Sequence, residues 1–342
     1  MFATAPSDSP ETITMSAPCV LLITILAVTR VSTYPHLHPV NVLFLVDPTL
    51  TEAVAYTQEL SAGWPGNARV TNCQNYSLAI PSNTRTYYDI AVHVTTGCPA
   101  AFTDTRIDMN VWDVGGGYAL PYWSWDWDRV LVTTKIMQRD FCGHRQYLCT
   151  VVPPKVHTTC VPRIREAVNY GYSTIGVFST PVAEREVLSI LHGAYGAPIL
   201  QEHYISLLDS NSSPYDHCEL LWDNIDAGVV WHSEPSIILD EVLRYAPCTA
   251  PATLAYLNIP FVMHQGFDCL ADFLDTDDMD LIAVDSYESL VLALDNLHNV
   301  TQGNEYWNVM RRIRYKTSIS HAMRLYYRLF VSMLQKYRIP IR

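Results

Sequence analysis

Residues 226–263 constrain the fold more than any other part of the chain, because they contain two apolar runs separated by a helix-length segment. The first run is Ala227–His232 and the second is Pro260–Met263, each with the length of a buried strand. A polar loop and the apolar segment Ala250–Leu257 lie between them. Strands joined by a helical crossover pair in parallel, because only such a connection is long enough. The unit therefore predicts a parallel sheet and an α/β fold.

Two series of such elements are predicted. The first begins with the near-continuous apolar strand Val40–Val46 and the helix Thr49–Leu60, which ends before Gly63. Its further strands are Ile90–Val94, Met109–Trp112, Arg129–Val132 and Tyr147–Val152. The second series adds the strands Ser173–Phe178, Pro198–Gln201 and Leu281–Val284, the helices Val182–Tyr195 and Tyr287–Leu297, and a helical stretch Asn304–Lys336 that breaks near Thr317 and Ser318.

The 342 residues exceed what one hydrophobic core usually organises, so we expect two domains. Pro153 and Pro154 open a polar segment over 153–162 that is typical of a linker. This divides the chain into an N-terminal Rossmann-like domain over 38–152 and a C-terminal one over 163–316, followed by a helix over 317–342.

The 226–263 unit resembles the donor-binding segment of GT-B glycosyltransferases of the group 1 type. The residues that carry the resemblance follow the family's pattern of a Pro and a Ser or Thr before a helix and a Gly-x-Pro-x-Val after it. They are Pro247, Thr249, Ala250, Ala255, Asn258, Pro260 and Val262. The likeness is divergent, since Ala250 stands where the family often has a basic residue and Asn258 where it has Gly.

The resemblance implies two Rossmann-like domains facing across a cleft, with the C-terminal helix crossing back to the N-terminal acceptor domain. It also implies transfer of a sugar from a nucleotide-sugar donor to a glycan or glycoprotein acceptor, with no obligatory metal or other cofactor. A catalytically inactive relative that binds glycans or acts as a scaffold is the alternative. A two-lobed solute-binding protein is a third class, but the single linker argues against it.

Donor-binding residues are expected near the diphosphate, where helix N-termini and basic side chains meet negative charge. Thr249 begins the predicted helix, with Arg244 five residues before it, and Thr249 serves equally well as a plain helix cap. Ser179 lies in the turn after the first strand of the second series, and Arg185 follows between two glutamates that offer it a surface ion pair instead. His232 is either a donor contact or a structural strand end.

The loop over 112–128 is the main candidate for acceptor binding, because it combines a Gly triplet with four Trp and two Tyr. Glycines let the backbone approach a ligand, and aromatic faces stack on sugar rings. Gly116, Tyr118, Trp123 and Trp125 are therefore the predicted acceptor contacts, although alternating Trp side chains also suit an irregular strand on a core. Asp113 directly follows a predicted strand, and we expect it to act as general base.

Charge and motifs exclude several functions. The net charge of −12 argues against a nucleic-acid partner, although nine Lys or Arg and no acid lie between Arg311 and Arg342. The spacing of Cys142, Cys149, His157 and Cys160 does not fit a zinc module, so no metal site is expected. The sequence contains no Gly-x-Ser-x-Gly motif, which argues against a serine hydrolase.

The first 33 residues are predicted to direct the chain to the secretory pathway. The uncharged run Ala17–Val28 is too short to span a bilayer and suits a signal peptide cleaved after Thr33, or an uncleaved signal anchor in the membrane. Eight cysteines outside this run permit disulfides, and sequons occur at Asn75, Asn211 and Asn299. We therefore expect a lumenal (ER or Golgi) or secreted glycoprotein.

Overall fold

The computed structural model describes residues 39–79, 87–95, 97–114, 126–156, 175–179, 181–195, 225–231, 249–266, 270–272 and 274–338. The statements below concern these residues. The predicted strand Pro198–Gln201 and the predicted leader lie outside them.

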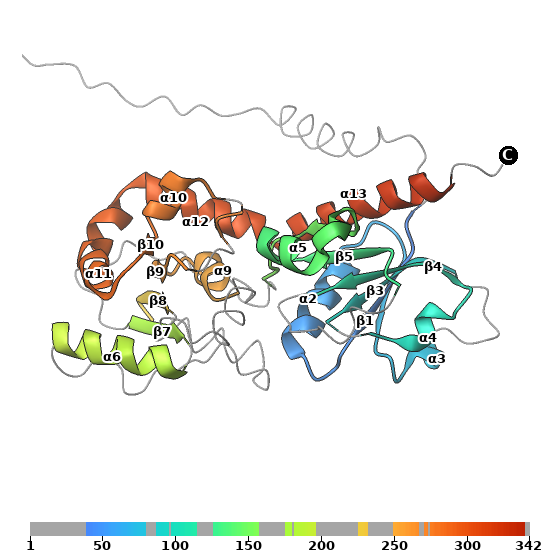
Figure 1. Cartoon of the computed structure of the whole chain (residues 1–342), viewed down its shortest axis with the longest axis horizontal. Helices are drawn as coiled ribbons and strands as arrows, with labels where there is room; N and C mark the ends of the chain where they lie inside the picture. Colours follow the sequence, from blue (N-terminus) through green and yellow to red (C-terminus); the bar gives the residue numbers. More distant parts are fainter. Residues whose placement is uncertain are drawn as a thin grey trace, which may run out of the picture. The chain divides into compact units, whose positions relative to one another are not determined.

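A six-stranded parallel sheet forms from the first part of the chain (Figure 1). Its spatial order is β2-β1-β3-β4-β5-β6, and every neighbouring pair is parallel. Parallel sheets are covered on both faces, which explains why β1 is apolar and buried at all five positions. The strands are β1 (Val42–Val46), β2 (Ala68–Thr71), β3 (Tyr88–Val94), β4 (Ile107–Asp113), β5 (Arg129–Val132) and β6 (Cys149–Val151).

A four-stranded parallel sheet forms from the second part, in the order β10-β9-β8-β7. Its strands are β7 (Ile175–Ser179), β8 (Ala227–Trp231), β9 (Phe261–His264) and β10 (Ala283–Val284). The parallel pairing of β8 with β9 across a helix confirms the predicted crossover. The fold is therefore α/β with parallel, Rossmann-like sheets, as the sequence predicts.

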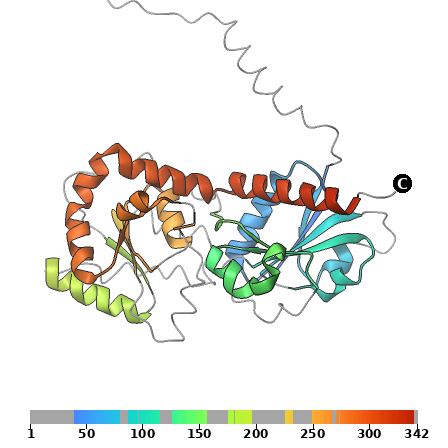
Figure 2. The ribbon, with the colours of Figure 1, turned by 45° about the horizontal axis from the view of Figure 1, so that its top comes forward.

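Helices accompany both sheets. In the first part they are α2 (Thr51–Ala62), α3 (Tyr76–Ala79), α4 (Pro99–Phe102) and α5 (Lys135–Cys142), with a 3-10 segment η2 (Gly143–Leu148). In the second part they are α6 (Pro181–Tyr195), α9 (Thr249–Tyr256), α10 (Thr276–Asp280), α11 (Tyr287–Gln302), α12 (Asn304–Lys316) and α13 (Ile319–Arg338). Figure 2 shows the red helix α12 followed directly by α13, with the break at the predicted residues 317 and 318.

The last two helices contribute to different hydrophobic cores. Tyr306 and Ile313 of α12 are buried with the side chains of β8 and β9. Tyr326 and Phe330 of α13 are buried with the side chains of β1, β3 and α2. Each side chain is fully buried, so each helix is fixed to its own core by large apolar contacts.

The helix α9 lies close to β8 because residue 228 is glycine. A Cβ atom added at Gly228 would lie 2.6 Å from Leu254 Cδ1, and 3.2 Å from the Cβ of Phe261. A larger residue at position 228 would require the Leu254 side chain to move. This contact packs Leu254, in the second turn of α9, against β8.

Two disulfides lie in the first part of the chain, joining Cys73 to Cys98 and Cys142 to Cys149. Disulfides form and persist in oxidising compartments, so they indicate an extracellular or lumenal environment. Among the described residues, no helix combines the length and the apolar character that crossing a membrane requires.

Several short elements escape sequence reasoning. β2 has the sequence ARVT, with partly exposed or exposed side chains and only two apolar residues, too few to show a period. α10 is five residues long and carries three aspartates, so it has no apolar face to reveal it. Tertiary context forms both elements: β2 pairs along β1, and Asp278 of α10 accepts a hydrogen bond from Arg312 of α12.

Candidate functional site

Ligands of open parallel sheets bind beyond the carboxyl ends of the strands, where the strand order reverses. In the six-stranded sheet this point is the β1–β3 pair, because β2 and β3 flank β1. Thr95 follows β3, and Asp113 is the last residue of β4, opposite Val94. Thr95 adopts a φ of 58°, which is unusual for a β-branched residue, and its N–H donates to the Asp113 carbonyl at 2.8 Å. The structure thus brings Asp113 to the edge where a functional group is expected.

Asp113 belongs to a buried polar cluster, here called the Asp113 cluster, which also contains Lys155 and Tyr326. The Lys155 ammonium donates to Asp113 Oδ2 at 2.6 Å and to the Tyr326 hydroxyl at 2.7 Å. The Tyr326 hydroxyl in turn donates to Asp113 Oδ2. Lys155 Nζ also lies 4.8 Å from the ring centroid of Tyr56 and 5.2 Å from that of Tyr326. Three distant chain segments therefore meet here: two supply the ion pair, and the third supplies the phenol that bonds to both of its members.

The Asp113 cluster is closed to solvent, with exposed fractions of 2% for Asp113, 5% for Lys155 and 0% for Tyr326. Burial, followed by the charge of Asp113, raises the pKa of Tyr326 well above its ordinary value. The phenol therefore stays protonated and acts as a donor to the carboxylate. Opposite charges in a low-dielectric interior hold one another strongly once both are buried.

This arrangement fastens α13 and the segment after β6 to the end of β4. Asp113 Oδ2 already accepts from two donors, and its side chain does not reach the surface. A general base must come within hydrogen-bond reach of the proton it removes. In the observed arrangement the Asp113 carboxylate is bonded to Lys155 and Tyr326. Its role as general base stays a prediction. Sequence reasoning missed both partners, because single Lys and Tyr residues far apart in the chain carry no motif.

His93, on β3, is a buried titratable residue outside the Asp113 cluster. Its Nδ1 accepts from the Cys98 N–H at 3.2 Å, so its proton lies on Nε2, which pairs with Asn110 Oδ1 at 2.9 Å. Burial lowers the pKa of His93 from 6.5 to about 4. The rings of Phe102 and Trp127 contact it at centroid distances of 5.1 and 5.0 Å. His93 is therefore a neutral, structural histidine at physiological pH.

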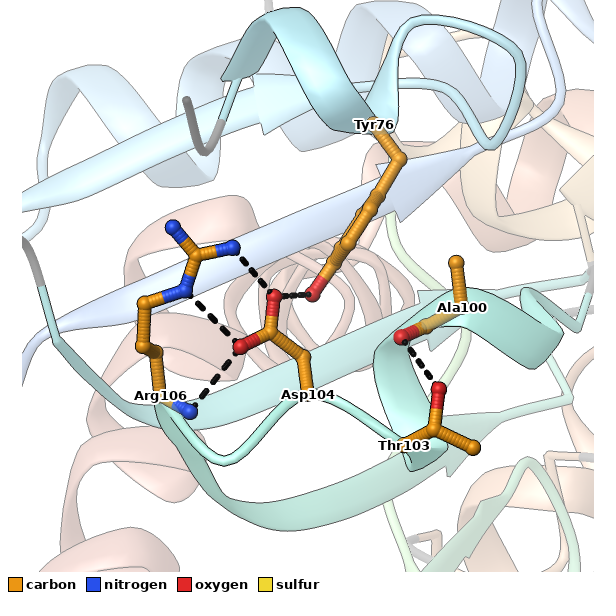
Figure 3. A network of polar contacts seen from close by, with 5 residues as sticks. All are labelled: Tyr76, Ala100, Thr103, Asp104 and Arg106. Atoms are coloured by element: carbon orange, nitrogen blue, oxygen red, sulfur yellow. Dashed lines mark hydrogen bonds and ion pairs between the residues drawn. The ribbon is translucent and has the colours of Figure 1, made fainter. Parts of the chain in front are cut away.

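A third polar network lies at the opposite, amino-terminal end of β4 (Figure 3). The Arg106 guanidinium donates to both oxygens of Asp104, and the Tyr76 hydroxyl donates to Asp104 Oδ2 at 2.9 Å. The bonds from Arg106 lower the pKa of Asp104 to about 2. Figure 3 shows the side chains of Arg106 and Tyr76 converging on the Asp104 carboxylate, which connects α3 to the turn before β4. The network serves the fold, since it lies away from the carboxyl edge.

Three of the five predicted donor residues belong to elements at the carboxyl edge of the four-stranded sheet. Ser179 is the last residue of β7, Arg185 is exposed on α6, and Thr249 is the first residue of α9. All three thus belong to elements that start or end at the same edge. An aromatic set that sequence reasoning missed lies there too. Trp231 stacks on Tyr287 at 5.1 Å and meets His264 at 4.7 Å, and the Tyr287 hydroxyl donates to Glu186 at 2.6 Å.

Asn258 caps the C-terminal end of α9. Asn258 adopts a φ of 58°, the left-handed conformation that glycine adopts freely and Asn tolerates best among other residues. The N–H of Ile259 donates to the carbonyl of Leu254 at 2.9 Å, and that of Asn258 to Ala255 at 3.3 Å. This is a Schellman cap, closed by contact between the buried side chains of Leu254 and Ile259.

The remaining predicted residues lie outside the described residues. They are Gly116, Tyr118, Trp123 and Trp125 of the acceptor loop, and Arg244 and His232 of the donor segment. The end of that loop is described: Trp127 stacks on Trp112 at 5.5 Å, and both are buried in a core. In the described ranges, no group of three or more His, Cys, Asp or Glu side chains is placed to hold a metal ion.

Comparison of the chain with protein-family models and with curated proteins finds no match. The functional assignment therefore depends on the residues and the geometry of this chain.

Proposed function

We propose that the chain is a nucleotide-sugar-dependent glycosyltransferase of GT-B type, with two Rossmann-like domains facing across a cleft. In this proposal the part that contains the four-stranded sheet holds the sugar nucleotide, and the part that contains the six-stranded sheet holds a glycan or glycoprotein acceptor. The nucleotide sugar is the only co-substrate, and no resident cofactor takes part.

The β8–α9–β9 unit carries the proposal. Its helix begins with Thr249 beyond the carboxyl end of β8 and ends in a glycine-type cap at Asn258. Gly228 lets Leu254 of α9 pack directly on β8, and in this proposal the diphosphate lies at the first turn of the same helix. Free N–H groups at a helix start favour an anion, and no charged side chain is needed for this part of the interaction.

The two disulfides favour a secretory-pathway location for this activity, in the lumen or outside the cell. Nucleotide-sugar transferases of glycoproteins act in such compartments. The N-terminal apolar run, as a cleaved signal peptide or a membrane anchor, agrees with the same location.

A catalytically inactive, glycan-binding or scaffold protein of the same fold is the second candidate. The observation that favours it is the burial of Asp113, whose carboxylate is occupied by Lys155 and Tyr326. Such a protein needs no general base at this edge. The two candidates differ in one measurable property, the binding of a nucleoside diphosphate.

The test is calorimetric titration of the purified full-length chain with UDP, GDP and their sugars. One nucleotide should bind, and Thr249→Val should weaken it about tenfold because a hydroxyl bonded to a charged phosphate is lost. Thr253→Val is the matched control, since it makes the same change one turn further along α9, and it should bind as the wild type does.

Failure of a folded sample to bind any nucleotide would remove the transferase proposal and leave the inactive candidate. Equal weakening by Thr249→Val and Thr253→Val would show that the change acts through the stability of the helix and not through a phosphate contact. Arg244→Ala then tests for a direct charge contact. If Arg244 contacts the diphosphate, the nucleotide affinity of the wild type should fall with added salt, and that of Arg244→Ala should fall less.

A further inference from the structure

The outer faces of α12 and α13 concentrate positive charge on an acidic protein. Nine of the 22 Lys and Arg residues lie between Arg311 and Arg342, where there is no Asp or Glu. The net charge of the whole chain is −12, so the preceding residues carry −21. The only acid of α12 is Glu305 in its first turn. This distribution calls for an explanation beyond solubility.

The fold turns these cations outward. On α13 the side chains of Ala322, Tyr326 and Phe330 are buried in the core of the six-stranded sheet. Arg324 and Arg328 lie on the opposite side of the same helix and are exposed. Residues four apart stack along one face of a helix, so these two arginines form a stripe parallel to the helix axis.

Four of these cations lie without a carboxylate partner in the part of the chain that the structure describes. Arg311 donates to Asn308 Oδ1 and, at 3.4 Å, to the Trp307 carbonyl, both neutral oxygens. Arg324 donates to the Ser320 carbonyl at 3.2 Å. Among the described residues, no acidic side chain pairs with Arg311, Lys316, Arg324 or Arg328. Arg312 differs, because it bonds to Asp278 and lies 3.6 Å from Asp275.

These groups converge on Tyr315. The Arg324 guanidinium lies 5.4 Å from the Tyr315 ring centroid, and the His321 ring lies 5.0 Å from it. Burial, and then the charges of Lys316, Arg324 and Arg328, lower the pKa of His321. A hollow of about 480 Å³ is lined by Asn308, Arg311, Arg312 and Tyr315.

We propose that this hollow and the adjoining cations bind an anionic saccharide, a sugar chain that carries sulfate or carboxylate groups. Guanidinium groups bind such anions through two parallel hydrogen bonds, and the exposed Tyr315 ring offers a face for a sugar. The hollow has the size of a small-ligand site. The acidic remainder of the chain disfavours a charged membrane, which would meet it beyond the hollow.

This site is separate from the proposed donor site on α9, and it does not depend on transferase activity. The test is fluorescence anisotropy of the full-length chain with a labelled sulfated hexasaccharide. The same hexasaccharide without sulfate, and inorganic sulfate as a competitor, show whether charge and sugar are both required. Vesicles with an anionic lipid test the competing partner.

The double variant Arg311→Gln/Arg324→Gln should weaken hexasaccharide binding tenfold or more and reduce its salt dependence. Arg145→Gln, which removes an exposed arginine from η2, should leave binding unchanged. UDP or GDP binding should be the same in all three proteins, so a failure of this site and a failure of the donor site are distinguishable.

Four outcomes would overturn the proposal. They are no binding of the sulfated hexasaccharide, equal binding of its sulfate-free form, equal loss in Arg145→Gln, and tight binding to anionic vesicles without saccharide binding. Full competition by inorganic sulfate at a concentration equal to that of the hexasaccharide would also count against a saccharide site, because it would show recognition of the anion alone.

Discussion

At the scale of single residues, His93 shows how burial fixes a protonation state. A proton on Nδ1 would face the Cys98 N–H, which already donates to that nitrogen, so two N–H donors would point at each other. The surrounding Phe102 and Trp127 rings offer no counter-charge. The pKa of about 4 in the folded chain therefore lies below the ordinary 6.5 of the unfolded chain.

Acid should consequently destabilise the protein through His93. The unfolded state binds the proton first, so this contribution is complete above pH 6.5 and is lost as the pH falls towards 4. It amounts to about 3 kcal/mol at most. Urea unfolding at about pH 7 and about pH 4.5 should show a smaller loss of stability in His93→Gln than in the wild type. The exposed His144→Gln is the control; if both variants keep the wild-type pH dependence, the prediction is wrong.

Asn258 shows what sequence could and could not predict at this scale. The sequence analysis placed Asn258 at a glycine position of the resembled pattern but predicted no backbone conformation there, and the structure gives it a φ of 58°. The pattern gave no sign of the Arg314 guanidinium that donates to Asn258 Oδ1 at 3.1 Å. Likewise, the end of a strand singled out Asp113, but its partners come from residues 155 and 326, which only the folded chain brings together.

At the scale of elements, long apolar strands and amphipathic helices were predicted within a few residues, because their periodicity is set by their own burial. β1, β5 and α6 are examples. β2 and α10 were not, since elements of four and five residues are too short to show a period and their partners lie elsewhere in the chain. Helix α13 was predicted from its periodicity. That periodicity gave no sign of the ion pair between Lys155 and Asp113, to which Tyr326 of α13 bonds.

Removing that ion pair should loosen α13. Lys155→Met leaves the Asp113 carboxylate buried without its cation, which should cost about 3–5 kcal/mol of stability. The double variant Lys155→Met/Asp113→Asn should recover part of the loss, because no charge then remains buried. Denaturant unfolding gives the cost, and hydrogen exchange of α13 amides locates it. Lys336→Met, an exposed lysine on the same helix, is the control and should match the wild type. Similar effects of Lys155→Met and Lys336→Met would contradict this role for the Asp113 cluster.

At the scale of the whole molecule, the two sheets have separate hydrophobic cores. The side chains of β7 to β9, α11 and α12 form one cluster, and those of β1, β3, β4, α2 and α13 form another. Separate cores permit separate unfolding, since a cooperative unit is held by its own buried contacts. Both disulfides among the described residues lie in the part with the six-stranded sheet.

Loss of one disulfide should therefore weaken one core and spare the other. Cys73→Ser/Cys98→Ser opens a loop with a sequence separation of 25, which should cost about 3 kcal/mol. Hydrogen exchange should then show faster exchange in β1 and β3, with β8 and β9 unchanged. Cys142→Ser/Cys149→Ser is the internal comparison, because its separation of 7 predicts a smaller effect on the same sheet. Equal acceleration in both sheets would mean that the two cores unfold as one unit, and the separate-core interpretation would have to be abandoned.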